Sequence, residues 1–77
     1  MIKIEVLKKL EHKGCPIYIR RLDTLFEYLI IYKGELYEEY FDIKPKWPRK
    51  DYSKKQLDNI VKLVYFSAYK TIDKLKN

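Results

Sequence analysis

The 77-residue sequence predicts an α+β domain, in which a four-stranded antiparallel sheet made of two hairpins is followed by one long C-terminal helix packed on it. Three observations favour this class. Apolar and polar residues alternate through much of residues 2–43, which is typical of strands with one buried face. Gly14 and Gly34 stand where tight turns need a permissive backbone. From residue 53 onward the apolar spacing changes to three and four, which is typical of a helix.

The first predicted hairpin begins with a strand at residues 2–8, and we expect the apolar side of this strand to be buried. That side consists of Ile2, Ile4 and Val6. A turn at 12–14 then leads to a second strand over 15–22, with Tyr18 and Arg20 facing outward. Its inward residues are Ile17 and Ile19.

The second predicted hairpin spans residues 25–43 and folds about Lys33 and Gly34. If Tyr32 pairs with Glu35, one face collects six apolar side chains. These are Phe26, Tyr28, Ile30, Tyr37, Phe41 and Ile43. The opposite face is not cleanly polar either. It carries Leu25, Leu29, Ile31, Leu36 and Tyr40, interleaved with Glu27, Glu38 and Asp42. A shift of one residue would exchange the two faces, so the sequence leaves the register open.

Residues 44–52 are interpreted as a stiff connector, because Pro45 and Pro48 exclude a central strand. Ser53 and Gln56 then form a capping box, which predicts a helix that starts there and continues to residue 76. The stripe expected to cover the sheet is Leu57, Val61, Val64, Ala68, Ile72 and Leu75. The middle of this helix is apolar nearly all round, which indicates burial on a second side.

Composition limits the possible functions of this chain, which we expect to form one domain over residues 1–77. Cys15 and His12 are the only cysteine and histidine, so we predict no disulfide, no metal site and no cofactor. We find no glycine-rich phosphate loop and no activated nucleophile, and therefore expect neither an enzyme nor a small-molecule substrate. The sequence shows neither a secretory signal nor an apolar run of about 18 residues. These features predict an intracellular, cytoplasmic protein that does not contact membranes.

The net charge of +6 is unevenly distributed. Residues 24–43 carry a net charge of −4, whereas residues 44–55 carry +5 beside an aromatic side chain. Clustered basic and aromatic residues are typical of phosphate and base contacts, although a solvated loop would have the same composition. The predicted nucleic-acid contacts are Arg20, Arg21, Lys44, Lys46, Trp47, Arg49, Lys50, Lys54 and Lys55.

These patterns predict a small basic, homodimeric nucleic-acid-binding protein with weak sequence specificity. We expect self-association through the helix, because its second apolar side has no sheet to cover. The residues concerned are Leu63, Phe66 and Tyr69. The order of elements is similar to that of the single-stranded-DNA-binding transcriptional coactivator domains, which dimerise through their helix, although the acidic hairpin departs from their basic sheet.

A second hypothesis is a protein-binding inhibitor or adaptor, of the kind that viruses and plasmids encode. It would act through the apolar helix face and the acidic hairpin, which together suit a basic protein surface. Its acidic contacts would be Glu35, Glu38, Glu39 and Asp42.

Overall fold

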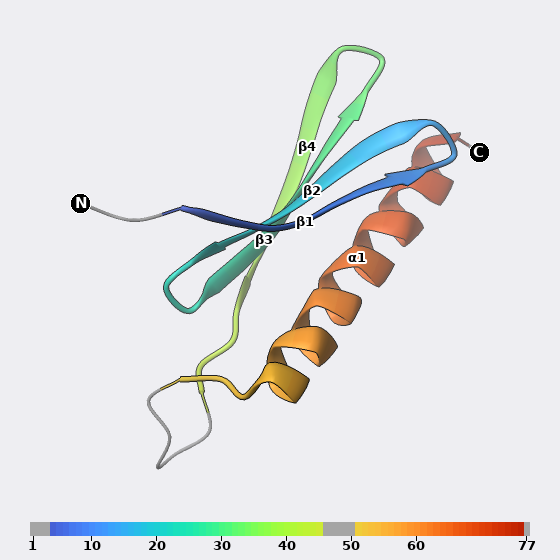
Figure 1. Cartoon of the computed structure of the whole chain (residues 1–77). Coiled ribbons are helices and arrows are strands. Elements are labelled where there is room, and N and C mark those ends of the chain that lie inside the picture. The colour runs from blue at the N-terminus through green and yellow to red at the C-terminus, as the bar shows by residue number, and fades with distance from the viewer. Residues whose placement is uncertain (1–3, 46–50, 77) are drawn as a thin grey trace.

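The computed structural model of the chain describes residues 4–45 and 51–76. Its elements, in chain order, are β1 (Glu5–His12), β2 (Cys15–Leu22), β3 (Leu25–Tyr32), β4 (Glu35–Asp42) and α1 (Lys54–Lys76). The four strands form one antiparallel sheet in the order β1-β2-β3-β4, and α1 crosses one side of it (Figure 1). The predicted fold class is therefore confirmed. Within the described residues, no helix combines the length and apolar character that crossing a bilayer requires.

The hairpin of β3 and β4 has the register predicted from Tyr32 and Glu35, which are paired in the structure. Its turn residues, Lys33 and Gly34, have φ values of 51° and 77°. Positive φ at both central residues gives the turn a backbone twist that matches the twist of the flanking strands. The apolar pairing and the turn therefore specify the same register.

Strand β1 contains a β-bulge, because its register on β2 shifts between Val6 and Lys8. Leu7 at the bulge and Leu10 beyond it pack against the core, whereas Ile4 and Val6 before it remain 52% exposed. The expected burial of Ile4 and Val6 is therefore wrong. The extra residue at the bulge changes which side chains of the strand face the helix.

The core lies between the sheet and α1, which packs against β1, β2 and β3. The helix contributes Ile60, Val64, Ala68 and Ile72. These four residues are each four apart, so they follow a single ridge inclined to the helix axis. Val64, Ala68 and Ile72 confirm the predicted stripe, but Ile60 is buried where Val61 was expected, and Val61 is only partly buried.

Candidate binding surfaces

The solvent side of α1 forms a surface that we call the outer helix surface. All of its members are exposed, and they are Lys55, Asn59, Lys62, Leu63, Phe66, Lys70 and Lys74. They lie on this side because the buried ridge of α1 occupies the opposite side of the helix. Leu63 is 52% exposed and Phe66 is 53% exposed, and both stand among lysines. The surface is therefore basic, with two apolar side chains near its middle.

The start of α1 is fixed by the predicted capping box. The Ser53 backbone N–H donates to Gln56 Oε1 at 3.0 Å, and the Gln56 backbone N–H donates to Ser53 Oγ at 3.2 Å. The first turn then presents Lys54 and Lys55, with no acidic side chain to match the positive end of the helix dipole. This turn can attract an anion, because its free N–H groups and its lysines carry the same sign of charge.

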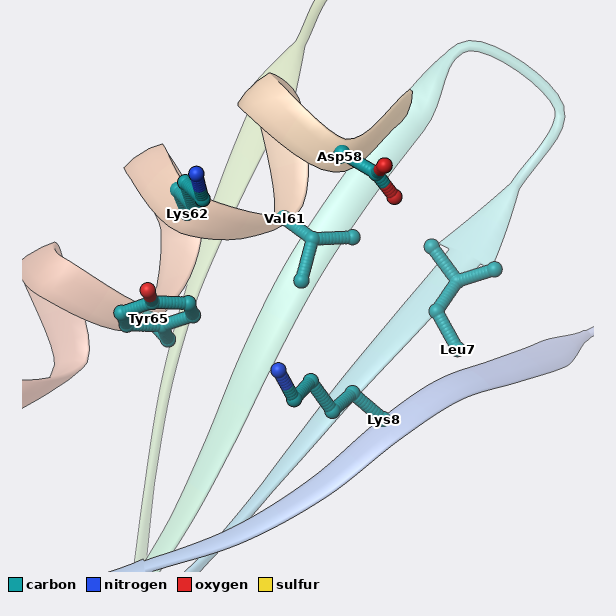
Figure 2. A pocket seen from close by; sticks show the side chains of 6 residues that line it. All are labelled: Leu7, Lys8, Asp58, Val61, Lys62 and Tyr65. Atoms are coloured by element: carbon teal, nitrogen blue, oxygen red, sulfur yellow. The ribbon is translucent and has the colours of Figure 1, made fainter. Parts of the chain in front are cut away.

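An open cleft of about 260 Å³ lies where β1 passes beneath the helix (Figure 2). Lys8 reaches into the cleft from the strand, and its Nζ lies 5.4 Å from the ring centre of Tyr65. Lys62 and Asp58 line the cleft from α1, one helical turn apart. The lining of the cleft thus combines two lysines, from the strand and from the helix, with one carboxylate and one phenol. The cleft extends the basic surface from the helix onto the sheet edge.

The two arginines predicted to bind nucleic acid point to opposite sides of the sheet. Arg21 lies on the helix side, with its guanidinium 4.9 Å from the ring centre of Tyr52. It donates from Nη2 to Asp51 Oδ1 at 3.1 Å and from Nε to the Asp23 carbonyl at 2.9 Å. The Tyr52 backbone N–H and the Arg21 guanidinium hold the pKa of Asp51 below its usual value. Arg21 thus joins the β2–β3 turn to the segment that precedes α1, which is a structural role.

Only some of the remaining predicted nucleic-acid contacts fall within the described residues. Lys46, Trp47, Arg49 and Lys50 lie outside the described residues. Lys44 is exposed and lines a second cleft of about 220 Å³ with Gln56 and Asn59. The structure therefore brings Lys44 beside the first turns of α1, which also carry Lys54 and Lys55.

On the side of the sheet away from α1, no helix of the described residues covers the strands, and we call this side the open face (Figure 1). The strand registers place two four-residue rows across its centre. One row is Lys9, Tyr18, Leu29 and Glu38, and the other is Val6, Arg20, Glu27 and Tyr40. The exposed apolar side chains on this face are Val6, Leu25, Ile31, Leu36 and Tyr40. The mixed character of this side was visible in the sequence, but no site was predicted on it.

The centre of the open face holds a buried ion pair. Glu27 is only 1% exposed, and its Oε1 accepts from Nε and Nη2 of Arg20. Glu27 Oε2 is also buried and has no hydrogen-bond partner among residues 4–45 and 51–76. Arg20 is thus already neutralised by a neighbour on β3, which weakens its predicted role as a phosphate contact.

The acidic residues of β4 are divided between the two sides of the sheet, because adjacent strand residues alternate. Glu35 accepts from the Tyr37 hydroxyl and Glu39 from the Tyr28 hydroxyl, both at 2.8 Å, so these two belong to the helix side. Burial, together with hydrogen bonding to Glu39, raises the pKa of Tyr28, although the Thr71 hydroxyl opposes that shift. Glu38 and Asp42 lie on the open face with Glu11 and Glu27. The predicted acidic site is therefore not one patch.

The residues predicted for self-association do not share one surface. Leu63 and Phe66 are exposed, whereas Tyr69 is partly buried and stacks on His12 with ring centres 4.2 Å apart. Near them, Asp73 Oδ1 lies 2.7 Å from Lys13 Nζ and 3.1 Å from His12 Nε2. These contacts from Lys13 and His12 lower the pKa of Asp73. Tyr69 therefore helps to attach the end of α1 to the β1–β2 turn.

Among residues 4–45 and 51–76, no group of three histidine, cysteine or acidic side chains is arranged to hold a metal ion. Comparison of the chain with protein-family models, with curated proteins and with solved structures finds no match in any of the three. The described surfaces are therefore interpreted from their own geometry and charge.

Proposed function

We propose that this protein binds nucleic acid, with weak sequence specificity, through the outer helix surface. The observation that carries the proposal is the opposite charge of the two layers. Helix α1 has six lysines and two aspartates, a net charge of +4, and one of those aspartates is paired with Lys13. Counted over the described strands, the open face has two basic and four acidic side chains, a net charge of −2. A polyanion is thus attracted to the helix layer and repelled by the open face.

The type of contact follows from the residues that carry the charge. Lysine ammonium groups bind phosphates as point charges and release counterions, which supplies affinity without reading bases. The cleft between β1 and α1 adds Lys8 to this surface, and Phe66 offers an exposed ring on which a base can stack. Few groups on this surface have the geometry for bidentate contacts with base edges, so we expect weak sequence specificity.

Fluorescence anisotropy with single- and double-stranded oligonucleotides at low salt tests the proposal. We expect the logarithm of the binding constant to fall linearly with the logarithm of salt concentration. Lys62→Glu should weaken binding and reduce that slope by roughly 1 or more, since it removes a phosphate contact and adds repulsion.

The matched control is Lys33→Glu, which makes the same charge change at the tip of the β3–β4 hairpin, away from α1. This variant should retain most of the binding. Equal losses in the two variants would show that only the total charge matters, and undetectable binding at low salt would eliminate the proposal.

A second candidate is binding of a partner protein, which the half-exposed Leu63 and Phe66 favour, because neighbouring exposed apolar side chains are typical of protein interfaces. The lysines around them would suit an acidic partner. Affinity capture followed by mass spectrometry, with wild-type protein and a Phe66→Ser variant as bait, tests this candidate. A protein held by the wild type and by Lys33→Glu, but lost from Phe66→Ser at moderate salt, would support it. Identical captures by all three baits would contradict it.

A further inference from the structure

The open face carries more exposed apolar surface than the outer helix surface does. Of the eight large apolar side chains that are exposed among residues 4–45 and 51–76, five lie on the open face. A sixth, Ile4, directly precedes β1. The helix layer lies entirely on the other side of the sheet (Figure 1). These side chains are spread from the β1 edge to the β4 edge, so a partner would have to cover the whole face to bury them.

The buried carboxylate of Glu27 adds a polar requirement to this apolar face. Its Oε1 is held by Arg20, but its buried Oε2 has no hydrogen-bond partner within the described part of the chain. Ionised carboxylates accept several hydrogen bonds, and buried polar atoms in folded proteins almost always have a partner. Glu27 is covered by its own chain, so an occupant of the open face meets the partly exposed Arg20 of this pair rather than the carboxylate itself.

We propose that the occupant is a second copy of this chain, related by a twofold axis that runs parallel to the strands in the plane of the interface. This rotation places β4 of one copy over β1 of the other, and β3 over β2. Two sheets would then pack face to face in the aligned arrangement of β-sandwiches. The contact would be isologous, so that each pairing occurs twice.

The charge pattern of the two central rows supports this axis. In the first row, Lys9 stands at the β1 edge and Glu38 at the β4 edge, so the rotation brings each of them opposite the other. In the second row, Arg20 and Glu27 occupy the inner strands, so the rotation brings Arg20 of the second copy over the negative end of the first copy's Arg20–Glu27 pair. The two ion pairs then lie head to tail across the interface. All four charges of the central rows are matched.

The other face-to-face twofold arrangement does not give this match. An axis perpendicular to the strands, within the interface plane, would place each strand over its own copy and exchange the two central rows. Glu27 would then lie over Leu29, and Lys9 would lie over Val6. Every charge in the rows would face an apolar or aromatic side chain. Charge complementarity thus selects one orientation.

The acidic residues outside the central rows are at the ends of the strands. Aligned sheets cross at about 30°, so the ends of the strands diverge and their side chains keep contact with water. Glu11 and Asp42 occupy such positions. The dimer would leave both outer helix surfaces on its outside, whether or not these surfaces bind nucleic acid.

The size of the face indicates the affinity to expect. Four strands of eight residues cover on the order of 500 Å² in projection, from a rise of about 3.3 Å per residue and a strand spacing of about 4.8 Å. Two such faces bury roughly 1,000 Å² in total, at the low end for specific interfaces. Dissociation constants in the micromolar range are therefore expected, and the mass must be measured over a series of concentrations.

Sedimentation equilibrium of the full chain tests the proposal through charge reversal of an exposed pair. Glu38→Lys should raise the dimer dissociation constant about tenfold, because two Lys9–Glu38 pairs become repulsive. Lys9→Glu should have the same effect, and the Lys9→Glu/Glu38→Lys double variant should return to within about threefold of the wild type. Within one chain Lys9 and Glu38 are three strand spacings apart, about 14 Å, so salt largely screens the electrostatic interaction between them. A rescue by the double variant therefore reports a contact between two chains.

Glu35→Lys is the matched control, because it makes the same charge change on the other side of the same strand. It should leave the dissociation constant unchanged. A monomeric wild type at high concentration, or a double variant as weak as the single variants, would overturn the proposal. A dimer that is abolished by Phe66→Glu but unaffected by Glu38→Lys would also overturn it and would place the interface on the helix.

Discussion

The pair of Arg20 and Glu27 allows a quantitative test of how this sheet is stabilised. Arg20→Met removes the guanidinium but leaves a carboxylate that is only 1% exposed. Breaking a buried ion pair in this way usually costs about 3–5 kcal/mol of stability. We expect about 3 kcal/mol, because the Arg20 side chain is 28% exposed and water can follow it towards Glu27. In a domain of this size, that loss lowers the melting temperature by roughly 12–24 °C.

The double variant Arg20→Met/Glu27→Leu removes both charges. It thereby distinguishes the attraction between the two charges from the free-energy cost of burying them. Replacing both charges by apolar side chains is often neutral, so the double variant should lie within about 1 kcal/mol of the wild type. Urea denaturation followed by circular dichroism, at concentrations where the chain is monomeric, measures both variants. Two results would refute the reasoning. One is an Arg20→Met cost below about 1 kcal/mol, and the other is a double variant as unstable as the single one.

Three further predictions concern the helix start, a turn and an ion pair. Ser53→Ala removes the Oγ that accepts from the Gln56 N–H, so it should cost about 1 kcal/mol in urea denaturation, whereas Ser53→Asp should retain most of the stability. Gly34→Ala should destabilise by about 1 kcal/mol in the same assay, since φ is +77° and nothing else lies within 4 Å of an added Cβ. An unchanged urea midpoint in Ser53→Ala or in Gly34→Ala would contradict the respective prediction. The contacts of Asp73 with Lys13 and His12 lower its pKa from the usual 3.8. These contacts therefore stabilise the fold fully above pH 3.8, and the stabilisation is lost as the pH falls through the lower pKa of the folded state. Asp73→Asn should therefore lower the urea midpoint at about pH 6 but scarcely at about pH 2, and an equal effect at both values would contradict this cause.

Much of the fold was predictable because local signals and long-range packing agree. The hairpin about Lys33 and Gly34 was predicted, and of the registers that the sequence left open the structure has the one that pairs Tyr32 with Glu35. The capping box of Ser53 placed the start of α1. Each of these features depends on residues close together in the chain, which single-sequence patterns describe well.

The bulge in β1 could not be predicted in the same way. Val6 and Leu7 are both apolar and adjacent, so the sequence is compatible with burial of either one. The choice depends on how β1 pairs with Arg20 and Ile19 of β2, which is information from another strand. The predicted burial of Ile4 and Val6 was wrong for that reason, whereas Ile2 lies outside the described residues.

The surfaces were predicted only in part. Alternation in β2 already indicated that Arg20 and Arg21 point to opposite sides, and the structure confirms this. The burial of Glu27 was not predictable from its outward position, because its burial and its ion pair depend on side chains of the neighbouring strands. Likewise, the sequence indicated that the side opposite the core is partly apolar, but only the sheet order shows how its charges are arranged.

The central claim is that the acidic, apolar open face pairs with itself while the basic outer helix surface remains available to nucleic acid. Sedimentation equilibrium of the full chain over a concentration series, alone and with a single-stranded oligonucleotide, tests both parts together. We expect the mass to rise with concentration from 9.5 kDa towards twice that value, and to increase further when the oligonucleotide is added at low salt. A mass of 9.5 kDa at every concentration, unchanged by the oligonucleotide, would contradict the claim.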